Sequence, residues 1–291
     1  MLDLMLSRKR RLMLTSAMIV FSACMLFIQF STGDAEAGIN VFFAVGIFML
    51  AAACEFVDTS LGMGYGTSLT PLLMLAGFSP ADIIPSILAS ELLTGGFASV
   101  MHWKDGNFNL NADAKLKVMV PVLVVLSFAG ALIAVTLSFK LSSAVWKYLI
   151  VGIICSMGVI ILFFRNSGGG VKPLRLLIIG FIASFNKGVS GGGYGPLMTA
   201  GQVTSGISSR TAVAVTSFTE FFTSLVAFSA FVAAGAKLNY SLMAPLMLGA
   251  VCVVPFATLT VRRVKEEKLR RMIGVLTLIL GSLIVVKALL N

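Results

Sequence analysis

Of the 291 residues, 58% are apolar and 12% are charged, and this charged share is about half of that found in a typical soluble domain. A soluble fold of this length could not bury so much apolar surface in one core, whereas a lipid bilayer can solvate it. The net charge of +10 then indicates basic loops beside a membrane rather than a nucleic-acid-binding protein. We therefore expect an all-α, polytopic integral membrane protein that contacts the lipid bilayer and no nucleic acid.

The first apolar run, residues 12–30, follows the basic sequence Arg8-Lys-Arg-Arg11. It is longer than the apolar region of a signal peptide, so we expect a retained helix with a cytoplasmic N-terminus, although Ala35-Glu-Ala37 is compatible with cleavage. The later runs are continuous rather than alternating, which predicts helices rather than barrel strands. Long helices are expected at 39–57, 83–101, 118–139, 144–164, 174–185, 211–236, 241–261 and 272–290, with shorter ones at 67–77 and 196–206.

A glycine-rich stretch precedes each short helix, Gly62-Met-Gly-Tyr-Gly66 in one case and Gly188-Val-Ser-Gly-Gly-Gly-Tyr-Gly195 in the other. A shift of 129 positions without gaps aligns residues 62–98 with 191–227, and 10 of 37 positions are identical, several times more than chance. Glycine-interrupted segments at matching positions of two repeats are typical of a transporter binding site. The sequence thus predicts an N-terminal region, a first repeat, a linking loop and a second repeat, at 1–38, 39–165, 166–172 and 173–291.

The positions of lysine and arginine distinguish two arrangements of these repeats. If both glycine-rich stretches cross the membrane with their short helices, there are eleven spans, the repeats are inverted, and 16 basic residues are cytoplasmic against four outside. If both are re-entrant, there are nine spans, the repeats are parallel, and the distribution is 12 against eight. The positive-inside rule favours the inverted arrangement.

The two glycine-rich stretches are candidate substrate-binding sites. Glycine disfavours helix, so the chain is expected to unwind there, and the half-helix that follows presents N–H groups suited to a small anion. We expect Gly64, Gly66, Gly193 and Gly195 in non-helical backbone that lines a common cavity; alternatively, the glycines only allow close helix packing. The candidate substrate-binding residues are Gly62, Gly64, Tyr65, Gly66, Thr67, Lys187, Ser190, Gly191, Gly192, Gly193, Tyr194 and Gly195.

Charged residues inside the expected helices are a second group of candidates. Glu91 and Glu220 occupy equivalent repeat positions, and such residues mark an ion or proton route or, alternatively, join the two repeats structurally. Asp58 and Lys187 precede the two breaks at equivalent positions, so the lysine could attract an anion and the aspartate could pair with the lysine. Because a protonated glutamate tolerates a neighbouring anion and an ionised one repels it, protons are a candidate coupling ion.

An intramembrane enzyme is a poorer interpretation. The sequence Gly188-Val-Ser-Gly191 matches the Gly-x-Ser-Gly pattern of rhomboid-type proteases, but their general base is a later histidine, and no histidine follows His102. We expect no catalytic residues and no enzyme activity. The four cysteines lie singly within apolar runs, so neither a metal site nor a cofactor is expected. His102 and Trp146 are expected at the membrane interface.

The duplicated glycine motif, with Gly-Gly-Gly-Tyr-Gly-Pro196 in the second repeat, resembles that of the sulfite exporter TauE/SafE family. The resemblance covers about residues 39–290. It implies two related halves, each with a glycine-rich motif near its start, and transport of small sulfur-containing anions such as sulfite or organosulfonates. The first repeat departs from the pattern, because Met63 interrupts the triple glycine and Thr67 stands where the second repeat has Pro196.

These features together predict a secondary transporter for a small anion, multi-pass in the cytoplasmic membrane. An anion channel of the same architecture and a non-transporting membrane sensor or scaffold are the alternatives. The sequence contains no ATP-binding motif, so the driving energy is expected to come from a gradient. The oligomeric state stays open.

Overall fold

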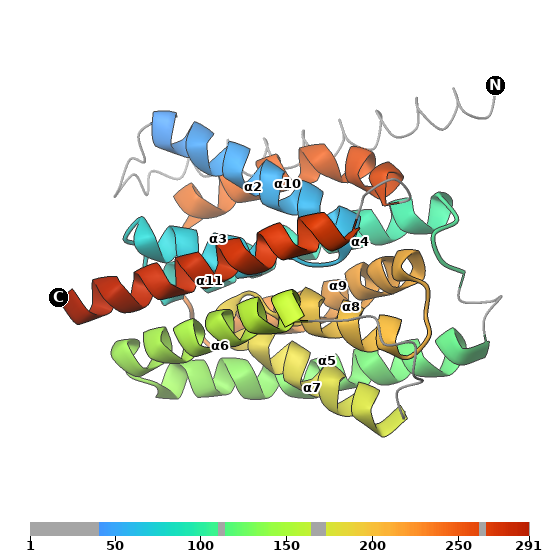
Figure 1. Cartoon of the computed structure of the whole chain (residues 1–291). Coiled ribbons are helices and arrows are strands. Elements are labelled where there is room, and N and C mark those ends of the chain that lie inside the picture. Colours follow the sequence, from blue (N-terminus) through green and yellow to red (C-terminus); the bar gives the residue numbers. More distant parts are fainter. Residues whose placement is uncertain (1–40, 110–113, 164–172, 262–265, 291) are drawn as a thin grey trace.

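The computed structural model describes residues 41–109, 114–163, 173–261 and 266–290, and helices are the only regular elements among them. The expected first helix at 12–30 and the loop 166–172 lie outside these residues. Figure 1 shows the helices as one bundle. In chain order they are α2 (Val41–Leu61), α3 (Tyr65–Leu75), α4 (Pro80–Lys104), α5 (Ala114–Lys140), α6 (Ser143–Phe163), α7 (Pro173–Ser190), α8 (Tyr194–Thr204), α9 (Ser209–Ala233), α10 (Tyr240–Thr260) and α11 (Glu266–Leu290).

Every helix expected after residue 38 is confirmed, and local sequence explains several of the boundaries. Ser79 begins α4 as an N-cap whose side chain accepts a hydrogen bond from the backbone N–H of Asp82. Ser208 does the same for α9 with the N–H of Thr211. Serine is a favoured N-cap because its oxygen satisfies a backbone donor that has no partner within the helix. The two caps stand 129 residues apart, as the repeat alignment requires.

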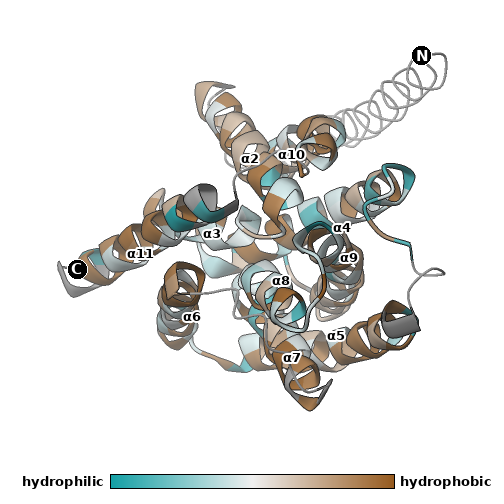
Figure 2. Ribbon diagram, turned by 45° about the vertical axis from the view of Figure 1, so that its right-hand side comes forward, coloured by the Kyte–Doolittle hydropathy of each residue, from teal (hydrophilic) through white to brown (hydrophobic). Residues whose placement is uncertain are grey.

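Six of the described helices, α2, α4, α5, α6, α9 and α10, are long and apolar enough to cross a membrane. Large apolar side chains such as Phe42, Val118 and Phe163 are exposed on the outside of the bundle. Figure 2 shows α5, α6, α7 and α11 coloured largely as hydrophobic, with more hydrophilic residues toward α3 and α4. Apolar side chains outside and polar ones inside are the arrangement expected in lipid, so the chain is a multi-pass membrane protein.

Each long helix that precedes a glycine-rich stretch forms a hairpin with the short helix after it. The ring of Phe43, at the start of α2, stacks on Phe78, just beyond α3, with centroids 6.0 Å apart. In the other hairpin Gly201, near the end of α8, packs against Leu176 and Ile179, near the start of α7. The 11 residues of α3 extend for about 16 Å, too short for the roughly 30 Å hydrocarbon core. The short helices therefore return toward the end from which their hairpin started.

The two hairpins open at opposite ends of the bundle. Near the open end of α2 and α3, Lys287 donates to the carbonyl oxygen of Leu75 at 3.1 Å, and Asn239 donates to Asp82 at 3.3 Å. Near the open end of α7 and α8, the hydroxyl of Thr211 donates to the carbonyl oxygen of Asn107 at 3.4 Å. Helix α4 runs between these two ends, with Asp82 in its first turn and Asn107 just after its last. Each hairpin thus begins and ends at the same end of the bundle, and whether the repeats are inverted or parallel stays a prediction.

Helix packing follows the same pairing in both halves. The pairs α2 with α10, α5 with α7, α4 with α9 and α6 with α11 are among those with the most extensive contacts. The helices α2–α6 can be matched in order with α7–α11, so that α2 corresponds to α7 and α5 to α10. Under this correspondence, the contact of α2 with α10 is equivalent to the contact of α7 with α5. The contacts of α4 with α9 and of α6 with α11 each join a helix to its own equivalent. Such exchange is expected of two halves related by an approximate two-fold axis.

Candidate functional site

The glycine-rich stretches interrupt the helices at Gly62–Gly64 and Gly191–Gly193. Gly64 has φ 137° and Gly193 has φ 81°, values that glycine adopts readily and residues with a side chain rarely do. These two glycines are the N-caps of α3 and α8. Gly66 and Gly195 lie in the first turns of those helices, so the expectation of non-helical backbone is wrong for this pair.

Gly66 and Gly195 are needed because the two breaks contact each other. A Cβ atom on Gly66 would collide with the backbone of Gly191 and Gly192, and one on Gly195 would collide with the carbonyl of Gly62. The two contacts are equivalent in the repeat alignment. The shift of 129 positions matches Gly66 with Gly195 and Gly62 with Gly191, so the contact of Gly66 with Gly191 corresponds to that of Gly195 with Gly62. Close packing, the alternative interpretation of the glycines, is therefore present at this crossing. That the same backbone lines a cavity stays a prediction.

Two threonines, one from each short helix, form hydrogen bonds across the place where the breaks at Gly62–Gly64 and Gly191–Gly193 contact each other, which we call the crossing. The hydroxyl of Thr70 in α3 donates to the carbonyl oxygen of Ser190 at 2.8 Å. The hydroxyl of Thr199 in α8 donates to the carbonyl oxygen of Gly62 at 2.9 Å. All four residues are buried, so each bond satisfies a carbonyl group that the end of a helix leaves free. The threonines are equivalent in the repeat and match in the alignment, which was the available signal for them.

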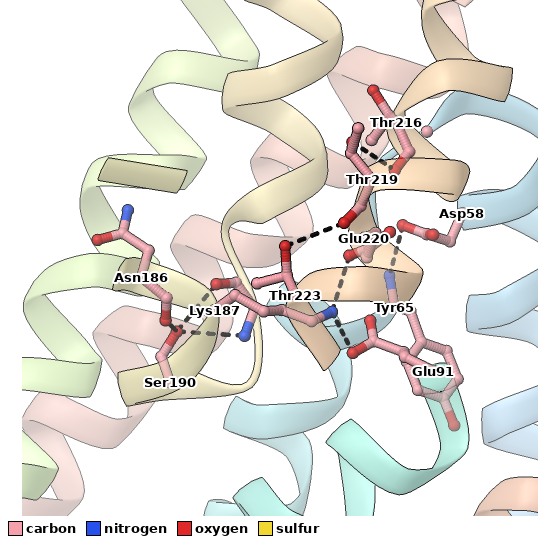
Figure 3. A network of polar contacts seen from close by, with 12 residues as sticks. Asp58, Tyr65, Glu91, Asn186, Lys187, Ser190, Thr216, Thr219, Glu220 and Thr223 are labelled. Atoms are coloured by element: carbon pink, nitrogen blue, oxygen red, sulfur yellow. Dashed lines mark hydrogen bonds and ion pairs between the residues drawn. The ribbon is translucent and has the colours of Figure 1, made fainter. Parts of the chain in front are cut away.

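Lys187 lies in the last turn of α7, beside this crossing, and its ammonium group contacts two carboxylates (Figure 3). Nζ is 2.7 Å from Oε1 of Glu220 on α9 and forms a second ion pair with Oε2 of Glu91 on α4. All three side chains are buried. A buried charge is tolerated when it is paired and hydrogen-bonded. The structure thus joins the two equivalent glutamates through one lysine.

Asp58, the repeat equivalent of Lys187, makes a different contact. Its Oδ1 accepts a hydrogen bond from the backbone N–H of Tyr65, the first residue of α3, at 3.3 Å. Among the described residues Asp58 forms no direct ion pair with Lys187; the two interact electrostatically, while the carboxylate binds the N-terminus of α3 and the lysine binds the glutamates. The N-caps Gly64 and Gly193 both have no side-chain cap hydrogen bond of their own, so the contact of Asp58 is what distinguishes the start of α3. Of the two equivalent half-helix N-termini, the first already holds a carboxylate of its own chain.

Glu55 is a buried acidic residue that the sequence analysis did not select. Its Oε1 accepts a hydrogen bond from the hydroxyl of Thr59 at 2.7 Å, whereas Oε2 has no hydrogen-bond partner in the described part of the chain. It interacts electrostatically with Asp58, Glu91 and Glu220. The available signal was an acidic residue inside an apolar run, three positions before Asp58 and hence on the same helix face.

The other predicted binding residues are buried but lie outside the ion pairs. The hydroxyl of Tyr65 bonds that of Ser90 at 2.6 Å, and Ser190 bonds the carbonyl oxygen of Asn186 at 2.8 Å. Tyr194 is 1% exposed. The hydroxyl of Thr67 is buried without a hydrogen-bond partner among the described residues. The structure thus brings these residues to the two breaks and leaves their binding role a prediction.

Two residues expected at the membrane interface are buried instead. Trp146, near the start of α6, donates from Nε1 to the carbonyl oxygen of Val189 at 2.8 Å, so it supports the end of α7 rather than an aromatic belt. His102 lies in the last turn of α4, fully buried, with Nδ1 2.8 Å from the side-chain nitrogen of Asn107. Both positions follow from helix packing, which the hydropathy pattern does not encode.

The site can hold ions by charge and by backbone N–H groups. Among the described residues, no three His, Cys, Asp or Glu side chains are arranged to hold a metal ion. That Lys187 and the N–H groups at the start of α8 bind an anion, and that protons are exchanged there, stays a prediction.

Comparison with known proteins assigns this architecture to a family. A relative in Bacillus subtilis (strain 168), named "Probable membrane transporter protein YtnM", is 27% identical over 232 residues, which cover 76% of this chain and 75% of the relative. No solved structure matches the chain. The family model described as sulfite exporter TauE/SafE matches residues 45–284, a range that includes both breaks, Lys187 and all four buried carboxylates. The chain is therefore a member of the sulfite exporter TauE/SafE family of membrane proteins.

Proposed function

We propose that the chain is a secondary transporter that moves a small anion across the cytoplasmic membrane. The observation that carries this proposal is the buried Lys187, held at the crossing of two broken helices by one glutamate from each half of the chain. A buried cation at such a crossing can replace the hydration that an anion loses on entering protein. Membership in a transporter family and the name of the Bacillus subtilis relative support the same assignment.

The proposed substrate is a sulfur-containing anion of the sulfite or organosulfonate type. The family name supports this class. The site offers one cation, Lys187, and the start of α8, whose N-cap is Gly193. A sulfonate or sulfite group has three oxygens, which suits several donors converging from a helix N-terminus and an ammonium group. The glycines of the breaks would let the backbone approach the anion closely.

We further propose that residues 39–165 and 173–291 form inverted repeats. The repeat shift relates the two glycine contacts and the two threonine bonds at the crossing. The two hairpins open at opposite ends of the bundle, as inversion requires. With a cytoplasmic N-terminus and one crossing by residues 12–30, the loops after α4 and α6 lie in the cytoplasm, on the side favoured by the basic residues.

Thermal unfolding of the purified protein in detergent tests the anion site. Sulfite, sulfate, thiosulfate, taurine, sulfoacetate and acetate are added separately, and we expect at least one sulfur-containing anion to raise the melting temperature, because a ligand stabilises the state that binds it. A Lys187→Met variant should lose the response. Uptake of the same anion into proteoliposomes, saturating with concentration, then establishes transport. A folded protein that neither binds nor moves any of these solutes would contradict the proposal.

Cysteine labelling tests the orientation of the membrane segments. In a background without the four native cysteines, Lys104→Cys and Ser142→Cys place thiols at two exposed positions, one at each end of the bundle. We expect an impermeant reagent on intact cells to label position 142 and to spare position 104 until the membrane is opened. The opposite pattern would reverse the proposed orientation, and labelling of both positions from outside would contradict the proposed arrangement of spans.

A further inference from the structure

The charge balance around Lys187 is uneven. Lys187 contacts the carboxylates of Glu91 and Glu220, and the carboxyl groups of Glu55 and Asp58 interact electrostatically with members of this group. We call these five residues the cluster. All five side chains are more than nine-tenths buried. Four negative charges against one positive charge would leave a net charge of −3, and an uncompensated charge of this size is strongly disfavoured in the protein interior. The carboxyl groups belong to Glu55, Asp58, Glu91 and Glu220.

The contacts of Lys187 limit how an anion can reach it. The ammonium group already has a carboxylate from α4 and another from α9 as its partners. An incoming anion must therefore displace one of these glutamates rather than join them, because three negative groups around one ammonium would repel each other. The displaced glutamate would then be a buried and unpaired charge, which is the costly state.

Resting on the proposed anion transport, we propose that Lys187 exchanges one glutamate partner for the substrate anion while the released glutamate binds a proton. The ion pair between lysine and glutamate breaks, an ion pair between lysine and anion forms, and the carboxylate takes up one proton from the medium to become a neutral carboxyl group. One proton neutralises each glutamate that is released, so with a monovalent anion the charge of the site is the same before and after, and with a dianion such as sulfoacetate it becomes more negative by one. Anion and proton therefore enter the site together and leave it together.

The remaining titratable groups near the cluster have other partners or no contact with the lysine. The carboxylate of Asp58 accepts from the N–H of Tyr65, and that of Glu55 accepts from Thr59. Direct contact with Lys187 is made by Glu91 and Glu220, so the exchange is assigned to these two. The other groups that face the cluster are Cys54 and Tyr65, beside Glu55, and Tyr194, beside Glu220.

Proton uptake on anion binding tests the exchange directly. Purified protein in a lightly buffered solution with a pH indicator is mixed with sulfoacetate, which has no group that titrates near neutral pH. We expect about one proton to be taken up for each sulfoacetate bound, and the affinity to fall by about tenfold for each unit of rise in pH, because binding is then linked to one proton. In proteoliposomes, an inward sulfoacetate gradient should carry protons inward.

Variants of the glutamates and a matched surface control complete the test. In the Glu91→Gln, Glu220→Gln double variant, Lys187 is free for the anion, so sulfoacetate should bind with no proton uptake and with little dependence on pH. The control is Glu267→Gln, which removes a glutamate from an exposed ion pair with Arg271 and should behave as the wild type. If the double variant does not fold, the two single variants replace it, and at least one of them should bind sulfoacetate without proton uptake.

The outcomes separate this inference from the proposed function. Sulfoacetate binding to the wild type without proton uptake would overturn the exchange and leave anion transport standing. Proton uptake that persists unchanged in the double variant, or in both single variants, would also overturn it. Failure of the folded wild type to bind any sulfur-containing anion would instead contradict the proposed function, and the exchange would fall with it.

Discussion

The two helix hairpins share a backbone design but differ in the charge at one equivalent position. Each has a long helix, a glycine break and an 11-residue helix, and each short helix is fastened to the other hairpin by a threonine. The first hairpin carries Asp58, whose carboxylate binds the start of its own short helix. The second carries Lys187, whose ammonium group binds glutamates from both halves.

This difference means that the two hairpins, although alike in backbone, would not offer an anion the same surroundings. In the first hairpin, the half-helix N-terminus is occupied by a carboxylate from the same chain, which takes the place that an anion would take. In the second, the corresponding N-terminus begins at Gly193, and Lys187 lies in the last turn of the preceding helix. The shared backbone serves the structure of the crossing, whereas the single cation gives the second hairpin the proposed role in anion binding.

Substitutions at the crossing should cause the largest loss of stability, because both hairpins contact each other there. Gly66→Ala or Gly195→Ala would drive a methyl group into the backbone of the other hairpin, and backbone cannot move aside as a flexible side chain can. We expect each variant to lose at least about 3 kcal/mol of stability, seen as a lower melting temperature or loss of folded protein in detergent.

Gly152→Ala is the control for the crossing, since a Cβ atom at that helical position meets nothing within 4 Å. Alanine there should leave the melting temperature unchanged or raise it slightly, because alanine favours helix over glycine. Equal melting temperatures for Gly66→Ala and Gly152→Ala would show that the hairpins do not touch as described. A large effect at only one of Gly66 and Gly195 would break the equivalence of the two halves.

Substitutions of Lys187 and Asp58, which occupy equivalent positions, should differ most clearly in their effects on stability and on anion binding. Lys187→Met leaves two buried glutamates without their cation, which we expect to destabilise the protein by about 3–5 kcal/mol and to abolish anion binding. Asp58→Asn keeps a side-chain oxygen that can accept from Tyr65 and should destabilise by about 1 kcal/mol or less, with binding retained. Thermal unfolding with and without sulfoacetate measures both. Loss of binding in a folded Asp58→Asn variant would place the anion site in the first hairpin as well.

Substitutions of Thr70 and Thr199 should cause the smallest losses of stability. Comparing the two losses tests whether the two halves contribute equally to the crossing. Thr70→Val and Thr199→Val each remove one buried hydrogen bond to the opposite break, which is worth about 0.5–1.5 kcal/mol. We expect Thr199→Val to be the more damaging of the two, because its hydroxyl also bonds that of Thr216 at 3.1 Å. A larger loss of melting temperature in Thr70→Val would contradict this asymmetry.

Much of the architecture could be predicted from the sequence, because helix formation in a membrane depends on local composition. Apolar runs, the serine caps at Ser79 and Ser208, and the glycine breaks are all set by neighbouring residues, so the helices expected after residue 38 were found within a few positions. The equivalence of Glu91 and Glu220 was also visible, since an acidic residue inside an apolar helix has few explanations other than a buried role.

The partners of the buried charges were decided by the tertiary structure. Asp58 and Lys187 occupy the same repeat position, and sequence alone suggested that they pair with each other. Which carboxylates reach the ammonium group depends on how α4, α7 and α9 cross, and that crossing rests on contacts between residues more than 100 positions apart, such as Gly66 with Gly191. The sequence thus determined the helices and the charges placed on them, and long-range packing determined which charges meet, because hydropathy specifies that a helix is buried but not against which neighbour.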